Sequence, residues 1–213
     1  EFRKNKENIF NKVFPVKIDS EKEINLNKYK NILKISDEYS EGKFFESGIM
    51  IEGTIFHYNV DSIKEDIFSL KEVIEKAKSY NDFDLKEYLV TDEKLEKWKY
   101  LKGGKRIERK TKEGHSYIYS EGNMAFPENM EEPARTLLTS EGTTNRSSHI
   151  IYDNKQKKYR TLTEIECEII QMFPPNWTDT MPKRNRYFMM GNALVTGIIS
   201  RLEPTLKKII ENE

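Results

Sequence analysis

Apolar residues recur with helical spacing in residues 69–79. Ser69 belongs to the residue types that cap the N-termini of helices. The positions i, i+3, i+4 and i+7 that follow it are occupied by Leu70, Val73, Ile74 and Ala77. This spacing predicts a short amphipathic helix that buries these residues. A second helix is expected over about 92–100, ending at the flexible pair Gly103-Gly104.

The same spacing returns near the C-terminus. Thr163 and Glu166 have the S/T-x-x-E spacing of a capping box, and Leu162 is placed to pack on Cys167 as a hydrophobic staple. We therefore expect a helix that begins at Thr163 and ends before Phe173, where two prolines follow.

A last helix is expected after residue 191. Asn192 is the predicted N-cap, and apolar residues follow it with helical spacing. Pro204 is expected to kink or interrupt this helix.

Between the helical segments the pattern is that of strands. One strand is expected in 13–18, and one or two in 45–60, broken at Gly53. Further short strands are expected at 115–122, 135–142 and 149–153. The predicted fold class is α+β, with a small irregular β-rich unit over about 100–153.

Composition restricts the class of protein. The 213 residues suffice for one domain or two small ones, and 36% hydrophobic with 34% charged residues predicts a folded, soluble chain. The sequence has no long apolar run and no secretory signal pattern, which favours an intracellular protein. The single cysteine excludes an internal disulfide, and the spacing of the three histidines does not suggest a metal site.

Charge is unevenly distributed along the chain. The net charge is zero, but residues 94–112 contain nine Lys or Arg and two Glu, so this basic segment carries +7 and the rest of the chain −7. Such a segment suits phosphate contacts, because neutralised phosphates release counterions. A solvated helix end followed by a mobile loop gives the same pattern, so charge alone leaves both interpretations open.

The segment from Arg160 to Trp177 resembles the ninth motif of DNA cytosine-5 methyltransferases, R-x-L-T-x-x-E-x-x-x-x-Q-x-F-P. The matching residues are Arg160, Leu162, Thr163, Glu166, Gln171, Phe173 and Pro174. The stretch from Tyr187 through Gly191 to Val195 is similar to the tenth motif. Residues 133–142 resemble the threonine-containing strand of the family's target recognition domain, with Thr136-Leu137 at its characteristic dipeptide.

The resemblance implies a division of the chain. Residues 1–18 would end the eighth-motif region, 19–158 would form the target recognition domain, and 159–213 would be C-terminal helices that complete a Rossmann-like methyltransferase domain located elsewhere. The cofactor loop F-x-G-x-G, the Pro-Cys nucleophile, Glu-Asn-Val and Q-x-R-x-R do not occur in these residues. A partner subunit or domain with motifs I to VIII is therefore expected, and the chain should be inactive alone. We do not expect Cys167 to be the nucleophile, because no histidine accompanies it.

The resemblance also implies site residues. The pocket for S-adenosylmethionine would be lined by Asn192, Ala193 and Leu194 of this chain. The candidates for contact with double-stranded DNA are Lys102, Lys105, Arg106, His115, Arg135, Thr136, Thr139, Ser140, Thr144, Asn145 and Arg146. Among them, Arg106 is expected to contact phosphate and Arg146 to read a base.

Two functions agree with these features. The first is the recognition part of a bacterial cytosine-5 methyltransferase, acting at the nucleoid in the cytoplasm. The second is a DNA-binding module or regulator without catalysis, derived from such an enzyme. The stretch resembling the tenth motif favours the first, because a pure DNA binder has no use for a cofactor wall.

Overall fold

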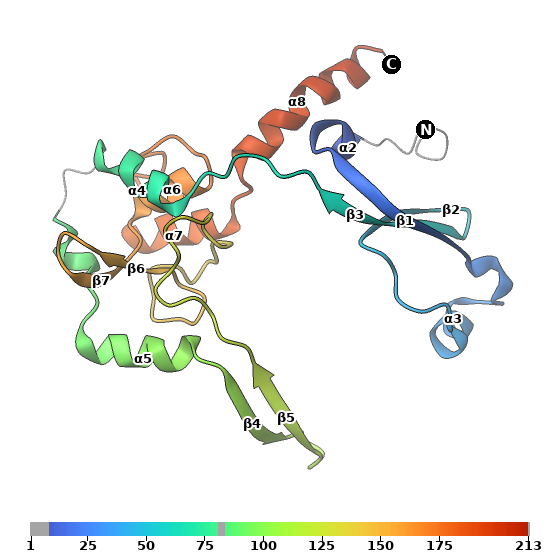
Figure 1. The fold of residues 1–213 in the computed structure, drawn as a ribbon, viewed down its shortest axis with the longest axis horizontal. Helices are drawn as coiled ribbons and strands as arrows, with labels where there is room; N and C mark the ends of the chain where they lie inside the picture. Colours follow the sequence, from blue (N-terminus) through green and yellow to red (C-terminus); the bar gives the residue numbers. More distant parts are fainter. Residues whose placement is uncertain (1–8, 81–83, 213) are drawn as a thin grey trace. The chain divides into compact units, whose positions relative to one another are not determined.

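The computed structural model describes residues 9–80 and 84–212. The chain divides into two compact units (Figure 1). The first unit combines the segment ending at Asp66 with the segment that starts at Arg201, and the second runs from Ile67 to Ser200. The α+β class is confirmed, and every sheet in the described ranges is antiparallel. The division into 1–18, 19–158 and 159–213 concerns roles rather than contacts and stays a prediction.

The first unit is built on a three-stranded sheet in the order β1-β3-β2. Its helices and strands are α2 (Ile9–Val13), β1 (Val16–Asn25), the 3-10 helix η1 (Leu26–Lys28), α3 (Ile32–Glu38), β2 (Ser47–Ile51) and β3 (Thr54–Ser62). The predicted break at Gly53 is confirmed as the turn between β2 and β3. Gly53 has φ of +75° there, a conformation that favours glycine.

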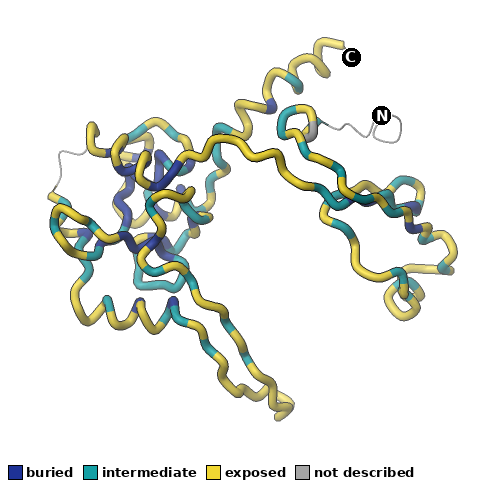
Figure 2. Tube along the Cα trace, viewed as in Figure 1, coloured by how far each residue is buried: buried dark blue, intermediate teal, exposed yellow. Residues whose placement is uncertain are grey.

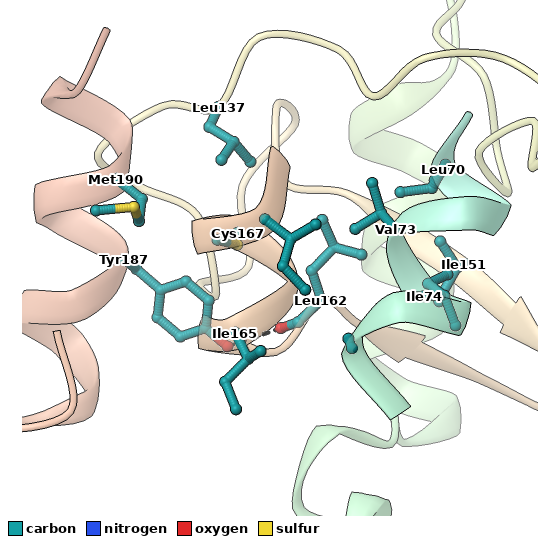
Figure 3. Packing of buried hydrophobic residues seen from close by; sticks show 12 residues of the cluster. Leu70, Val73, Ile74, Leu137, Ile151, Leu162, Ile165, Cys167, Tyr187 and Met190 are labelled. Atoms are coloured by element: carbon teal, nitrogen blue, oxygen red, sulfur yellow. Dashed lines mark hydrogen bonds between the residues drawn. The ribbon is translucent and has the colours of Figure 1, made fainter. Parts of the chain in front are cut away.

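The second unit contains the main hydrophobic core. Helices α4 (Leu70–Lys78), α6 (Glu164–Ile170) and α7 (Lys183–Asn192) surround it (Figure 3). The four predicted apolar residues of α4 are all buried, and Ser69 forms a capping box with Glu72. Figure 2 shows that burial in this unit concentrates around these helices. Both predictions for α4 are therefore confirmed.

The predicted start, capping box and end of α6 are also confirmed. Thr163 and Glu166 form the expected capping box, and the helix ends at Ile170, before Phe173. Leu162 and Cys167 both belong to the buried core. The Tyr187 hydroxyl of α7 donates a hydrogen bond to the Leu162 carbonyl at 2.7 Å, which fastens α7 to the start of α6.

Smaller elements surround this core. They are the 3-10 helix η2 (Leu85–Tyr88), α5 (Asp92–Lys102), β4 (Lys105–Lys110), β5 (Ser116–Glu121), β6 (Ile150–Asp153) and β7 (Lys158–Thr161). The helix predicted over 92–100 and the strands predicted at 115–122 and 149–153 are confirmed. The strand predicted at 135–142 is wrong, because no neighbouring strand pairs with this segment in the described ranges. Leu137 is buried in the core instead.

The predicted start of the last helix is wrong. Asn192 is the last residue of α7, and α8 (Thr196–Ile210) begins four positions later. The helical spacing of Tyr187 and Met190, both buried, makes the segment before Asn192 a helix as well. Helix α8 continues without interruption through Pro204, and Leu202 beside it is buried.

Candidate functional site

One arm of an exposed β-hairpin is strand β4, which carries four of the nine basic residues of the basic segment. Strand β4 pairs with β5 from Lys105 opposite Glu121 to Lys110 opposite Ser116. The connecting turn has φ of +90° at Gly114, and the Thr111 amide donates to the His115 carbonyl at 2.9 Å. Lys105 and Arg106, two of the DNA candidates, both lie on this regular strand.

One face of this hairpin is occupied by contacts among its own side chains. The Arg109 guanidinium lies over the Tyr119 ring, 3.8 Å from its centroid. The Tyr119 hydroxyl donates to the Glu121 carboxylate, which lowers the pKa of that carboxyl. Lys105 donates to Glu121 at 3.0 Å and to the Leu101 carbonyl at 2.9 Å. Lys105 is therefore held at the base of the hairpin.

The opposite face carries charges without such partners. Arg106 and Glu108 are exposed, and neither side chain forms a hydrogen bond or ion pair with another residue in the described ranges. An open depression of about 400 Å³ lies beside them, lined by Arg106, Glu108, Ser116, Tyr117 and Ile118. These side chains are available to a ligand.

Arg146 fixes the base of the hairpin. Its guanidinium donates to the carbonyls of Leu101 and Gly103 on one side of the hairpin and to the Gly122 carbonyl on the other. It also lies 3.0 Å from the Glu121 carboxylate. Because these contacts occupy both ends of the guanidinium, we no longer include Arg146 among the candidate base readers.

This geometry predicts a difference in stability between two arginine variants. Arg146→Ala should lower the free energy of unfolding by about 2 kcal/mol, because it removes charged hydrogen bonds to backbone carbonyls. Arg106→Ala should change it by no more than about 0.5 kcal/mol, as for an exposed side chain without partners. Urea denaturation followed by tryptophan fluorescence measures both values. Equal values for the two variants would contradict the bracing role of Arg146.

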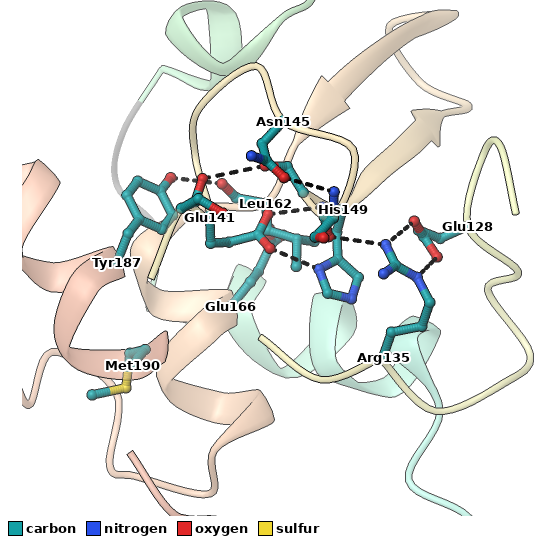
Figure 4. Close-up of polar contacts among 12 residues, drawn as sticks. Glu128, Arg135, Glu141, Asn145, His149, Leu162, Glu166, Tyr187 and Met190 are labelled. Atoms are coloured by element: carbon teal, nitrogen blue, oxygen red, sulfur yellow. Dashed lines mark hydrogen bonds and ion pairs between the residues drawn. The ribbon is translucent and has the colours of Figure 1, made fainter. Parts of the chain in front are cut away.

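Lys102 and Arg135 share one buried carboxylate. Lys102 is 1% exposed and pairs with Glu128 at 3.0 Å, while Arg135 donates two hydrogen bonds to the same carboxylate (Figure 4 shows Arg135 and Glu128). Burial lowers the pKa of Lys102. Burial alone would raise the pKa of Glu128, but hydrogen bonds from Arg135 and the charge of Lys102 lower it. Lys102 therefore does not reach the surface, and we remove it from the DNA candidates.

A second buried pair holds the loop that carries three further DNA candidates. Glu141 accepts from the His149 amide at 2.8 Å and contacts its Nδ1 at 2.9 Å (Figure 4). The Asn145 carbonyl accepts from the indole of Trp98 at 3.1 Å. The loop is thereby joined to α5, and it presents three partly exposed candidates: Ser140, Thr144 and Asn145.

The segment around Thr136 lies against α7. Thr136 is exposed, while the neighbouring Leu137 is buried in the core. A Cβ added to Gly191 would lie 2.3 Å from the Thr139 amide nitrogen, so this glycine permits α7 to approach the backbone there. Within the stretch similar to the tenth motif, Gly191 therefore serves a contact between two backbone segments.

The residues that fit the ninth-motif pattern perform structural tasks. Arg160 forms two hydrogen bonds with Glu166, at 2.7 and 2.8 Å, and both residues are buried. The Gln171 amide donates to the Met190 carbonyl at 2.7 Å and to the Ala193 carbonyl at 3.3 Å. This amide fixes the backbone at the end of α7.

The predicted cofactor residues follow directly from that anchor. Asn192 and Leu194 are exposed, Leu194 at 72%, and Ala193 is partly buried. The Asn192 amide donates to the Phe188 carbonyl at 3.1 Å, within its own helix. The side chains of Asn192 and Leu194 are thus accessible from outside the unit.

Comparison with known proteins decides the family. A family model described as C-5 cytosine-specific DNA methylase matches residues 2–208. The chain belongs to the cytosine-5 DNA methylase family. It is 44% identical over 179 residues to the type II methyltransferase M.Sau3AI of Staphylococcus aureus. The aligned part covers 84% of this chain and 41% of that relative, so the chain spans about two fifths of the relative's length. No solved structure matches the chain.

The single cysteine of this methylase chain lies in helix α6. Cys167 is fully buried, and burial raises the pKa of its thiol. Within residues 9–80 and 84–212, no cluster of three metal-ligating side chains occurs, and no helix is long and apolar enough to cross a membrane.

Sequence reasoning missed several residues that arrange this part of the methylase. Glu128 and Glu141 are buried acids that organise two loops, and Glu108 was counted only as an interruption of the basic segment. The run 105–110 carries little strand signal of its own, because Ile107 is its one apolar residue. Nothing local identifies the partners of the two buried acids, because they come from distant segments.

Proposed function

We propose that these residues recognise a short sequence in double-stranded DNA and complete the S-adenosylmethionine pocket of a DNA cytosine-5 methyltransferase. The polypeptide that carries the family's first eight motifs would perform catalysis, either as a separate subunit or as another part of the same protein. The observation that carries this proposal is the family match over residues 2–208. The exposed basic hairpin, which Arg146 fixes at its base, supports the DNA-binding part.

The proposed DNA contacts divide by chemistry. Lys110 and Lys112 are exposed on the hairpin and suit phosphates, which take most contacts in protein–DNA interfaces. The remaining candidates lie on the hairpin turn, on the segment that packs against α7 or on the loop held by Glu141. They are His115, Thr136, Thr139, Ser140, Thr144 and Asn145.

The proposed cofactor wall is the end of α7. Gln171 holds the Ala193 backbone, and the neighbouring side chains of Asn192 and Leu194 face outward. A pocket for S-adenosylmethionine also needs walls from the polypeptide that carries the first cofactor loop. This arrangement favours the methyltransferase part over a DNA-binding module without catalysis.

Apolar side chains around that wall suit an interface with the proposed catalytic part. Within the second unit, α7, α8 and their connection expose Phe188, Met189, Leu194, Ile198 and Ile199, each by 40% or more. Several exposed large apolar side chains on neighbouring segments are a feature of protein interfaces. We propose that the catalytic domain or subunit covers it.

The DNA-binding part is tested by the dependence of affinity on salt. The 213-residue chain should bind a random-sequence duplex more weakly as salt rises, because bound lysines release counterions from phosphates. Lys112→Ala should flatten the slope of log K against log[salt] by about one unit. Fluorescence anisotropy with labelled duplex measures the slope.

The matched control removes one exposed lysine of α8. Lys207→Ala takes away the same charge from a helix outside the proposed DNA surface, and the slope should not change. Absence of duplex binding by the wild-type chain at low salt would contradict the proposed function. Equal slopes for Lys112→Ala and the wild type would contradict the placement of phosphate contacts on the hairpin.

A further inference from the structure

The two faces of the β4–β5 hairpin differ in how their charged side chains are used. On one face, Lys105, Arg109, Tyr119 and Glu121 contact one another or nearby backbone. On the other face, Arg106 and Glu108 border the open depression, and no ion pair or hydrogen bond joins them to other residues of the described ranges. The second face therefore has unused hydrogen-bonding groups at fixed positions.

The shape of this hairpin fits the major groove of B-DNA. The groove is about 12 Å wide and admits a two-stranded β-ribbon. Arg106 and Glu108 are two residues apart on one strand, so their side chains leave the same face about 6.7 Å apart. Successive base pairs are stacked about 3.4 Å apart, so this separation corresponds to about two base-pair steps.

The unpaired carboxylate decides between phosphate contact and base contact. A glutamate that faces DNA repels phosphates, so it weakens any binding that depends only on the backbone. A carboxylate accepts a hydrogen bond from the N4 amino group of cytosine, and an arginine suits O6 and N7 of guanine. A neighbouring arginine and glutamate on one face are therefore better explained as base readers than as phosphate contacts.

Building on the proposed function, we propose that Arg106 and Glu108 are specificity-determining residues that read two base pairs about two steps apart in the major groove. Arg106 donates to guanine, and Glu108 accepts from cytosine. This assignment replaces the expectation from sequence that Arg106 contacts phosphate. On the opposite face, Arg109 lies over the Tyr119 ring, a contact that joins the two strands of the ribbon.

The experiment is a selection from a pool of duplexes with a randomised central window, followed by sequencing and by titration of the enriched duplex. The wild-type 213-residue chain should enrich a short motif. Glu108→Gln should reduce the preference for one base at one position of the motif by roughly 10- to 100-fold. Arg106→Ala should reduce the preference for one base at another position by a similar factor. Circular dichroism establishes that both variants keep the fold.

The matched control for the charge is Glu113→Gln in the hairpin turn, which removes one exposed carboxylate from the same hairpin but not from this face. It should leave the enriched motif unchanged. If Glu108 faces DNA without reading it, Glu108→Gln should instead strengthen binding to all duplexes equally, which would overturn its role. If Arg106→Ala weakens binding to all duplexes equally, the proposal that Arg106 reads guanine is likewise overturned.

The same experiment separates the two proposals. If the wild-type chain enriches a motif and both variants enrich the same motif at every position, the reading face is wrong and the proposed function stands. If the wild-type chain enriches no sequence, both proposals fail.

Discussion

Arg160→Met is expected to lower the free energy of unfolding of the second unit by about 3–5 kcal/mol. Arg160 is 2% exposed, and its guanidinium forms two hydrogen bonds with the buried Glu166 carboxylate. Methionine fills much of the same volume but leaves that carboxylate without its cation. Glu166 also accepts from the Thr163 amide at 2.7 Å, so the capping box of α6 should weaken as well.

The measurement is urea denaturation followed by tryptophan fluorescence. The two tryptophans of the chain, Trp98 and Trp177, both belong to the second unit, so their emission reports on its unfolding. Lys99→Met is the matched control, because it breaks an exposed pair with Glu96 and should change the free energy by no more than about 0.5 kcal/mol.

A variant with both charges removed keeps this prediction testable if the single variant does not fold. Arg160→Met combined with Glu166→Gln removes both charges of this pair, although Asp153 still loses its contact with Arg160, and should be less destabilised than the sum of the single changes. If Arg160→Met lowers the free energy of unfolding by less than about 1 kcal/mol, the pair of Arg160 and Glu166 is not important for folding.

Local signals made parts of this fold predictable from the sequence. A capping box lies within four consecutive residues, so Thr163 and Glu166 identify the start of α6 without knowledge of the rest of the fold. The buried face of α4 follows from the spacing of Leu70 and Val73 in the same way. Such patterns need only the helical period and the composition of one segment.

Other parts of the fold and of the candidate site depend on contacts between segments that are distant in the sequence. Lys102 looks like any basic residue of its segment, and only the fold brings Glu128 to it at 3.0 Å. Arg146 was a plausible base reader until the structure placed the carbonyls of Leu101 and Gly122 around its guanidinium. The partners of these cations lie more than twenty residues away in the chain, so no local pattern identifies them.

The misplaced helix start has a different cause. Residues on both sides of Gly191 have helical spacing, so the pattern alone does not locate the end of α7 and the start of α8. In the structure, the side-chain amide of Gln171 donates hydrogen bonds to the carbonyls of Met190 and Ala193. This anchor ends α7, and the Thr196 amide then donates to the Gln171 carbonyl at 3.0 Å as α8 begins.

The purified 213-residue chain should transfer no methyl groups from labelled S-adenosylmethionine to duplex DNA. Transfer to C5 of cytosine requires an accessible thiolate, and the one cysteine of this chain is buried within α6. Burial raises the pKa of the Cys167 thiol, which disfavours the thiolate further. A protein that carries the family's first eight motifs should bind the exposed apolar surface formed by Phe188, Leu194 and Ile198 and restore transfer to one short sequence.

Two cysteine variants make this prediction decisive. Transfer by the mixture should disappear when the cysteine of the partner's Pro-Cys dipeptide is replaced with alanine. It should persist with Cys167→Ala in this chain, because that thiol packs in the core and faces no substrate.

Replacing Ile198 with aspartate should weaken association of the two proteins, since a charge would be buried in the apolar interface. Transfer by the chain alone that Cys167→Ala abolishes would overturn the proposed division of tasks, because this chain would then supply the nucleophile.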